Sequence, residues 1–277
     1  MAAAGPAYDA AAVWDIATPS RPGLLPGVAM AGFRAQTLTP VDLTVIPYPA
    51  VTVAVIFGDA LVIDDSTGRQ HQDTVVTGLA PGSLRARGRG DLECLQLRLS
   101  PLVAHAVLGD CAGLGGLVAS LDDLWGPAAA RAREQLHAAR SWDERFAIAA
   151  ATLGQRLEAG RAADPEVAFA WRRMAANQGR IRVERLAAET GWSRKRLWSR
   201  FRSQLGLTPK RTAQLVRFDH AAHRLAAGHS PAEVAADSGY ADQSHLHREA
   251  MALSGLTPTA VAAAPWLAVD PVAWPRR

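Results

Sequence analysis

The chain has 277 residues, of which 49% are hydrophobic and 20% charged, a globular composition that excludes disorder along its whole length. This length is enough for about two domains of roughly 100 to 200 residues each. The longest strongly apolar run, 51–57, is far shorter than the roughly 18 to 20 residues of a membrane helix, so we expect no membrane span. The first residues lack a basic secretion signal and the chain has only two cysteines, which predicts a cytoplasmic, reducing location in a bacterial cell.

The net charge of +4 is distributed very unevenly. Residues 171–217 contain thirteen Lys and Arg against two Glu, a net charge of +11. The segments 1–100, 101–170 and 218–277 carry −2, −3 and −2. A local excess of this size beside acidic neighbours indicates a surface that binds a polyanion, and nucleic acid is the first candidate.

The first half of the chain has the pattern of short strands separated by turn formers. Strand-like runs occupy 41–46, 51–57, 60–63, 72–77 and 93–99. Many short strands without helices between them predict a small antiparallel β-barrel or sandwich, whose mouth is able to hold a ligand. We therefore assign residues 1–125 to an effector-binding or sensing domain.

No catalytic or metal-binding constellation accompanies these strands. His71 is the only histidine before residue 105, and we interpret it as a surface loop residue because one ligand does not make a metal site. Cys94 lies in an alternating strand and is interpreted as a packed thiol. The sequence has no Gly-rich phosphate loop, nucleophile elbow or supported carboxylate pair. We predict that the protein is not an enzyme and has no metal or cofactor.

Helical periodicity begins after Pro101. Helices are expected at 101–108, 127–137 and 142–158, and the small and polar residues 160–165 break the pattern. We interpret 126–165 as a helical linker or dimerisation region and 166–277 as a DNA-binding domain. The overall fold class is then α+β, with an all-α C-terminal domain.

The C-terminal part contains an internal repeat. Leu-Ala-Ala-Glu-Thr-Gly-Trp at 186–192 aligns with Val-Ala-Ala-Asp-Ser-Gly-Tyr at 234–240, and each copy ends in Gly-Leu-Thr-Pro, at 206–209 and 255–258. Each copy predicts a helix, a glycine turn and a second helix, which is the helix-turn-helix pattern, at about 181–205 and 230–254. Gly191 and Gly239 supply the turns, and Ser193 and Asp242 cap the second helices.

Between the copies, 210–227 is expected to form one helix of 18 residues. At about 1.5 Å per residue such a helix spans roughly 27 Å, comparable with the roughly 34 Å of one DNA turn. One chain is thus able to place two recognition helices in successive major grooves, as a monomer or within a homodimer. His220 with His223, and His245 with His247, lack the further ligands of a metal site.

A helical projection identifies the side chains that would face DNA. With Leu197 and Phe201 inward, the first recognition helix turns its basic, polar and indole side chains outward. With Leu246 inward, the second helix turns hydroxyl, imidazole and guanidinium groups outward. The outward side chains are Lys195, Arg196, Trp198, Ser199, Arg202, Ser244, His245, His247 and Arg248, and the predicted DNA-binding set also includes Arg194.

These motifs, from about Arg172 to Val261, resemble the AraC/XylS family of bacterial transcription regulators. The resemblance rests on both glycine turns, both Gly-Leu-Thr-Pro segments, Ser193 to Phe201 and Val234 to Arg248. It implies two helix-turn-helix units joined by a long helix. It also implies base contacts at the positions of Lys195, Trp198, Ser199, Gln243, Ser244, His247 and Arg248. The family usually has an aromatic residue where Ala250 stands, which predicts a smaller core in the second unit.

The first half is more weakly similar to the cupin-like sensing half of such regulators, through 99–109 and 121–126. The resulting hypothesis is a one-component transcription regulator that binds double-stranded promoter DNA. It responds to a small molecule in its N-terminal barrel and contacts RNA polymerase if it is an activator. One alternative keeps the DNA binding but makes the N-terminal domain a ligand-free dimerisation or polymerase-contact module. Another is a cupin enzyme fused to a DNA-binding tether.

Overall fold

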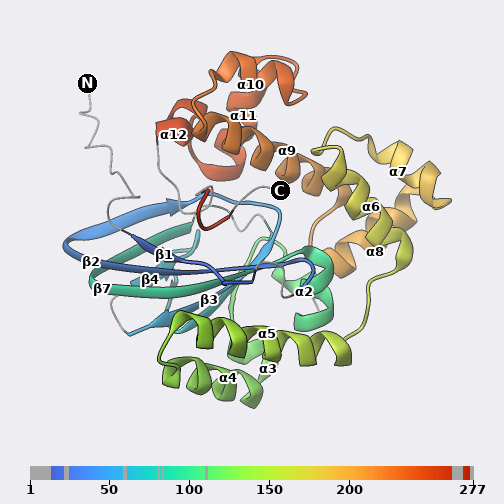
Figure 1. Cartoon of the computed structure of the whole chain (residues 1–277). Coiled ribbons are helices and arrows are strands. Elements are labelled where there is room, and N and C mark those ends of the chain that lie inside the picture. Colours follow the sequence, from blue (N-terminus) through green and yellow to red (C-terminus); the bar gives the residue numbers. More distant parts are fainter. Residues whose placement is uncertain are drawn as a thin grey trace.

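The chain folds into a curled antiparallel sheet, a layer of helices on one side of it and a larger group of helices on the other (Figure 1). The computed structural model describes residues 14–21, 25–58, 61–79, 82, 84–109, 112–263 and 271–274. The predicted α+β class, with an N-terminal antiparallel sheet and C-terminal helices, is confirmed.

The sheet has eight strands in the order β1-β2-β7-β3-β6-β8, and β4 pairs with both β5 and β7. All its pairings are antiparallel. The strands are β1 (Asp15–Ala17), β2 (Val28–Val45), β3 (Val51–Phe57), β4 (Leu61–Asp64), β5 (Gln70–His71), β6 (Thr74–Thr77), β7 (Leu84–Leu99) and β8 (Val118–Ser120). We call this curled sheet the barrel.

Strand β7 is the centre of the barrel. It pairs with β2 along its whole length, and on its other edge with β3 and then with β4. In this register Cys94 lies between Phe33 and Ile56, and all three side chains join one buried cluster on the inner face of the barrel. Burial raises the pKa of Cys94 to about 12, so the packed-thiol interpretation is confirmed.

Strands β2 and β7 are much longer than the sequence pattern predicts. The extra part of β7, from Leu84 to Gly90, alternates arginine with small residues, so its hydrophobic period is weak. The ladder with β2 and two ion pairs, Arg85 with Asp42 and Arg87 with Asp64, stabilise this extension instead. His71 is half-buried in β5 and lies 2.9 Å from Asp65, rather than in an open loop.

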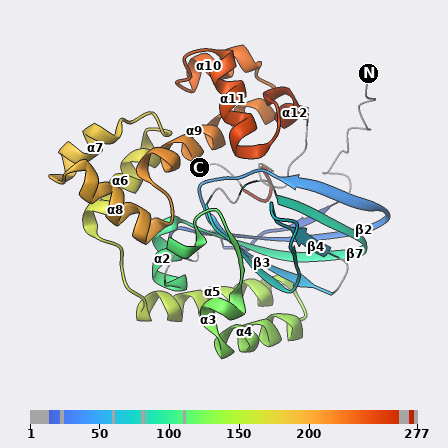
Figure 2. The ribbon, with the colours of Figure 1, turned by 180° about the vertical axis from the view of Figure 1, so that it is seen from behind.

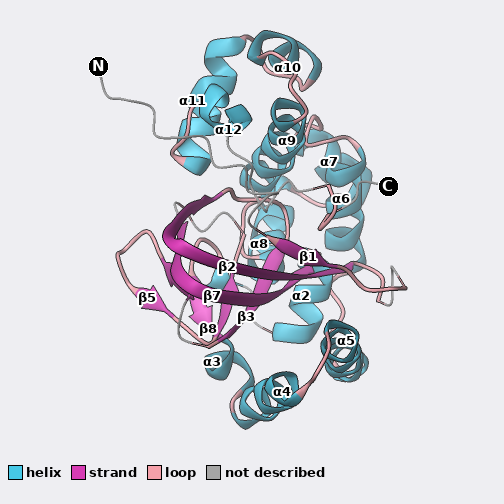
Figure 3. Cartoon of the chain, turned by 60° about the vertical axis from the view of Figure 1, so that its left-hand side comes forward, coloured by secondary structure: helices cyan, strands magenta, loops and turns pink. Residues whose placement is uncertain are grey.

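The outer face of the barrel is covered by the helices that follow β7. These are α2 (Pro101–Leu108), the short 3-10 helix η1 (Ala112–Leu114), α3 (Leu121–Trp125), α4 (Pro127–Ala138) and α5 (Trp142–Ala159). Figure 3 shows α3, α4 and α5 beside the sheet. These helices bury Leu136, Phe146 and Leu153 against Val53, Leu95 and other outer-face residues. The ring of Trp142 lies so close to Gly32 of β2 that a Cβ there would collide with it, which fixes the approach of α5.

The remaining helices form the C-terminal part, on the opposite side of the barrel from α4 and α5 (Figure 2). They are α6 (Pro165–Ala176), α7 (Val183–Thr190), α8 (Arg194–Leu205), α9 (Pro209–Ala226), α10 (Pro231–Asp237), α11 (Gln243–Ser254) and α12 (Pro258–Ala263). Helix α9 joins three buried clusters: Leu215 lies with the outer-face core, Val216 with α6 to α8, and Phe218 with α10 to α12. Helix α9 therefore belongs to the apolar interior of both halves of the molecule.

A substitution at Leu215 tests whether α9 packs on the N-terminal half. Its side chain is completely buried, so Leu215→Ala is expected to lower the free energy of unfolding by about 2 to 5 kcal/mol in urea denaturation. Lys210→Ala, on the exposed start of the same helix, serves as control and should change stability by less than about 0.5 kcal/mol. Equal stabilities of the two variants would show that α9 does not pack on the N-terminal half.

Candidate nucleic-acid interface

The first helix-turn-helix unit consists of α7, a glycine turn and α8. Gly191 adopts φ +68°, the left-handed conformation that favours glycine, and so ends α7. Ser193 caps α8 by accepting a hydrogen bond from the backbone amide of Arg196 at 3.2 Å. Leu186, Leu197 and Phe201 are fully buried between α7, α8 and α6. The predicted inward face of this recognition helix is thereby confirmed.

The second unit consists of α10, a glycine turn and α11. A capping box begins α10: Ser230 accepts from the amide of Glu233, and the Glu233 carboxylate accepts from the amide of Ser230. Gly239 has φ +77°, and the Asp242 carboxylate caps α11 through the amide of His245 at 2.6 Å. Both helix-turn-helix units thus form from the local signals that the sequence carries.

The core of the second unit is completed from outside it. Ala250 is fully buried together with Leu246 and Val261. It stands at the position for which the resemblance implies a larger, aromatic side chain. Ile46, at the end of β2, is 1% exposed and belongs to the same cluster. A residue of the barrel therefore contributes to the core on which the second recognition helix rests.

The structure exposes almost the whole predicted DNA-binding set. On α8 these exposed residues are Arg194, Lys195, Arg196, Trp198, Ser199 and Arg202, and on α11 they are Gln243, Ser244, His247 and Arg248. His245 differs, because it is half-buried with its ring 5.3 Å from the ring of Tyr240 and edge-on to it. Trp198 keeps 46% of its surface exposed, an unusual position for an indole unless it contacts a partner.

Several arginines of the strongly basic residues 171–217 already form ion pairs with carboxylates. Arg200 makes two hydrogen bonds to Asp164, at 2.7 and 2.9 Å, and Arg173 makes two to Glu189. Arg194 reaches Glu184 at 3.4 Å, but both side chains are exposed. Within the described ranges, Lys195, Arg202 and Arg248 have no carboxylate within ion-pair distance. These three charges are available to an anionic partner.

The structure also shows a buried ion pair that sequence patterns did not indicate. Arg217 of α9 contacts the carboxylate of Glu249 on the inner side of α11, with Nε 3.1 Å from Oε1. Burial works to lower the pKa of Arg217, but the hydrogen bond and charge of Glu249 outweigh it and raise that pKa. Tyr240 packs against the same guanidinium. This pair attaches the second recognition helix directly to the connecting helix α9.

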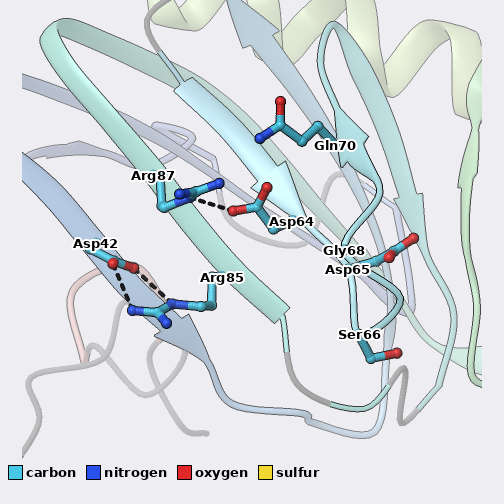
Figure 4. Close-up of a pocket in the computed structure, with 8 residues that line it drawn as sticks. All are labelled: Asp42, Asp64, Asp65, Ser66, Gly68, Gln70, Arg85 and Arg87. Atoms are coloured by element: carbon cyan, nitrogen blue, oxygen red, sulfur yellow. Dashed lines mark hydrogen bonds and ion pairs between the residues drawn. The ribbon is translucent and has the colours of Figure 1, made fainter.

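Two pockets in the described part of the barrel bear on ligand binding. Next to its inner face lies a cavity of only about 60 Å³, lined by Tyr48, Thr52 and Gln96 among others. A second, open pocket of about 480 Å³ lies at the β4–β5 hairpin (Figure 4). Its arginines, Arg85 and Arg87, are held by Asp42 and Asp64 across the strands, so its charges are already paired.

The described part of the chain contains no group of three or more His, Cys, Asp or Glu side chains arranged to hold a metal. None of its helices combines the length and apolar character that crossing a bilayer requires.

Comparison with known proteins identifies the C-terminal part. Residues 186–264 match a family described as a helix-turn-helix domain. No curated protein matches the chain.

Similar solved structures include ToxT from Vibrio cholerae O395, which is 9% identical with a TM-score of 0.48 and covers 86% of this chain and 98% of its own. ToxT from V. cholerae strain SCE256 with a bound unsaturated fatty acid is 10% identical, TM-score 0.46, covering 84% and 94%. The AraC-like transcriptional activator CuxR is 16% identical, TM-score 0.31, covering 69% and 80%.

The buried pair between α9 and α11 gives a stability prediction. Glu249→Ala leaves the Arg217 charge buried without its partner and is expected to cost about 3 to 5 kcal/mol in urea unfolding. The double variant Arg217→Met with Glu249→Leu should recover most of this loss. Glu184→Ala, which breaks an ion pair between two exposed side chains, is the control and should cost much less, because such exposed pairs contribute little to stability. A loss as small as that of the control would show that the pair is not buried.

Proposed function

Residues 186–264 are a helix-turn-helix domain of the AraC type, and from this we propose that the chain is a sequence-specific, one-component transcription regulator. The observation that carries the proposal is the pair of exposed recognition faces, one on α8 and one on α11, joined by a single helix. Their outward side chains are donors and acceptors for phosphates and base edges.

The two recognition helices are proposed to enter successive major grooves on one face of DNA. Helix α9 has 18 residues and spans roughly 27 Å, which leaves each unit about one DNA turn from the other. Lys195 and Arg202 supply phosphate attraction in the first unit. Trp198 offers an apolar surface to a base, such as the methyl group of thymine.

DNA binding by the second unit is proposed to depend more on the geometry of its hydrogen bonds than on its net charge. Residues 218–277 have a net charge of −2, so α11 adds little long-range attraction. Gln243 and Arg248 are suited to bidentate contacts with adenine and guanine, and Ser244 and His247 are suited to single hydrogen bonds. We therefore assign most of the salt-dependent affinity to α8 and a larger share of the sequence discrimination to α11.

The N-terminal barrel is proposed to regulate this activity. A ligand acts on DNA binding only by binding two arrangements of the molecule with different affinity. The inner cavity of the barrel, about 60 Å³, is far below the roughly 300 Å³ of a typical small-molecule site, whereas the open pocket at the β4–β5 hairpin, about 480 Å³, is large enough for one. The alternative is a barrel that binds no ligand and serves only for dimerisation or polymerase contact.

DNA binding is tested first with the full-length protein and fragmented genomic DNA. We expect recovery of a limited set of sequences. The affinity for them should fall steeply as the salt concentration rises from about 50 to about 200 mM. Recovery without sequence preference at every salt concentration, or no recovery, would contradict the proposed function.

Arg248 tests the role of α11. Arg248→Ala should weaken binding to the recovered site by about 1 to 3 kcal/mol and relax discrimination at a few base pairs of one half-site. Arg202→Ala should weaken binding to all sequences alike and reduce the salt slope by about 1. The matched control is Arg133→Ala, a charge removed from α4, which should leave DNA affinity unchanged. Equal losses for Arg248→Ala on all sequences would reassign Arg248 to phosphate.

A further inference from the structure

A short segment beyond the DNA-binding domain packs on the barrel. Residues 271–274, coloured red in Figure 1, lie between the sheet and the C-terminal helices. Ala273 and Trp274 are 3% and 8% exposed and belong to the inner-face cluster of the barrel, whereas Pro271 and Val272 face solvent. The segment therefore docks through two side chains, and the larger of them is an indole.

Trp274 covers an arginine at the end of the barrel. The guanidinium of Arg98, on β7, lies between two rings, 3.7 Å from the centroid of Tyr48 and 3.6 Å from that of Trp274. Its Nε and Nη2 atoms are out of contact with solvent. Trp274 also contacts Phe33, with ring centroids 6.1 Å apart. Cation–π contacts are strongest when both groups are desolvated, as they are here.

The same arginine is electrostatically connected to the DNA-binding domain. Burial lowers the pKa of Arg98, while Tyr48 and Asp219 act in the opposite direction. Asp219 is a residue of α9, the helix between the two recognition units. The end of the barrel, the 271–274 segment and the connecting helix thus meet around one buried charge.

The segment gives the DNA-binding domain a second attachment to the barrel. The first attachment is the chain itself at 160–164, between α5 and α6, together with the packing of Leu215 of α9 and of Ile46 between the two halves. The second is Trp274, which follows α12 along the chain, and α12 packs on α9 through Val261 and its neighbours. A body attached at two points loses more of its freedom to reorient than one attached at a single point.

Tyr48 connects this contact to the cavity in the barrel. Its ring stacks on Arg98, and Tyr48 also lines the cavity of about 60 Å³ and bonds to Thr52 beside it.

We propose that Pro271–Trp274 is an internal ligand of the barrel, which occupies the binding position around Arg98 and Tyr48 and holds the DNA-binding domain in one orientation. An effector that takes the place of Trp274 releases this second attachment and changes DNA affinity. The second part of this inference rests on the proposed function, because DNA affinity is its readout.

The first experiment compares full-length Trp274→Ala with the unaltered protein. We expect its affinity for the recovered DNA site to change by at least about threefold, because one of the restraints on the orientation of the DNA-binding domain is lost. Val272→Ala, in the same segment but 60% exposed, is the control and should behave as the unaltered protein. Trp274→Phe keeps an aromatic ring over Arg98, so its DNA affinity should lie between those of Trp274→Ala and the unaltered protein. This intermediate variant separates loss of the contact from loss of folding.

The second experiment restores the contact from outside. A labelled peptide of residues 270–277 is titrated into full-length Trp274→Ala, and fluorescence anisotropy should show saturable binding. The peptide should also reverse the change in DNA affinity. The same peptide with alanine in place of tryptophan should do neither.

The outcomes distinguish this inference from the proposed function. If the unaltered protein and Trp274→Ala bind the same DNA site with equal affinity, the regulator assignment stands and the internal-ligand proposal is overturned. Absence of peptide binding to a folded Trp274→Ala variant overturns it as well. Loss of selective DNA binding by the unaltered protein contradicts the proposed function, while peptide binding still tests the docking of the segment.

Discussion

Burial of helix α9 is the constraint on which the rest of the structure depends. A surface helix normally buries one apolar stripe, but α9 contributes side chains to three separate clusters. Leu215 packs against the barrel's helices, Val216 against the first recognition unit and Phe218 against the second. The positions of both recognition helices relative to the barrel are therefore determined by the packing of one element.

Close backbone contact and charge reinforce this packing. Near η1, Gly115 lies against the carbonyl of Gly206 at the end of α8, where no side chain would fit. In the middle of α9, Arg217 attaches α11 through Glu249. Buried pairs of this kind are sensitive to geometry, because a small displacement leaves two charges without compensation. The molecule is thus built to favour a few discrete arrangements rather than continuous bending.

Local features of the C-terminal part were predictable from the sequence. The Ser230–Glu233 capping box, the Ser193 and Asp242 caps and the turns at Gly191 and Gly239 all involve residues within a few positions of one another. Such contacts follow from backbone chemistry alone. Helical periodicity likewise identified which sides of α8 and α11 are exposed, with His245 as the half-buried exception.

The features that the sequence could not reveal are long-range. Arg217 and Glu249 are 32 positions apart, and each alone has the pattern of a solvated charge. The length of β7 depends on its partner strands, because the alternation of arginine and small residues has no clear hydrophobic face. The position of Trp274 against Arg98 required the folded chain, since no local pattern relates the end of the sequence to a strand of the barrel.

The contribution of Ile46 to the core around Ala250 bears on how such proteins diversify. Regulators assembled from two domains are often pictured as exchangeable parts, in which a new sensor is joined to an old DNA reader by recombination at the connecting segment. Here a cut at 160–164 would separate the second recognition unit from one of its own core side chains. A recombined chain would inherit a hole beside Ala250 unless its new partner brought a side chain of similar shape, so the two halves are under pressure to evolve together.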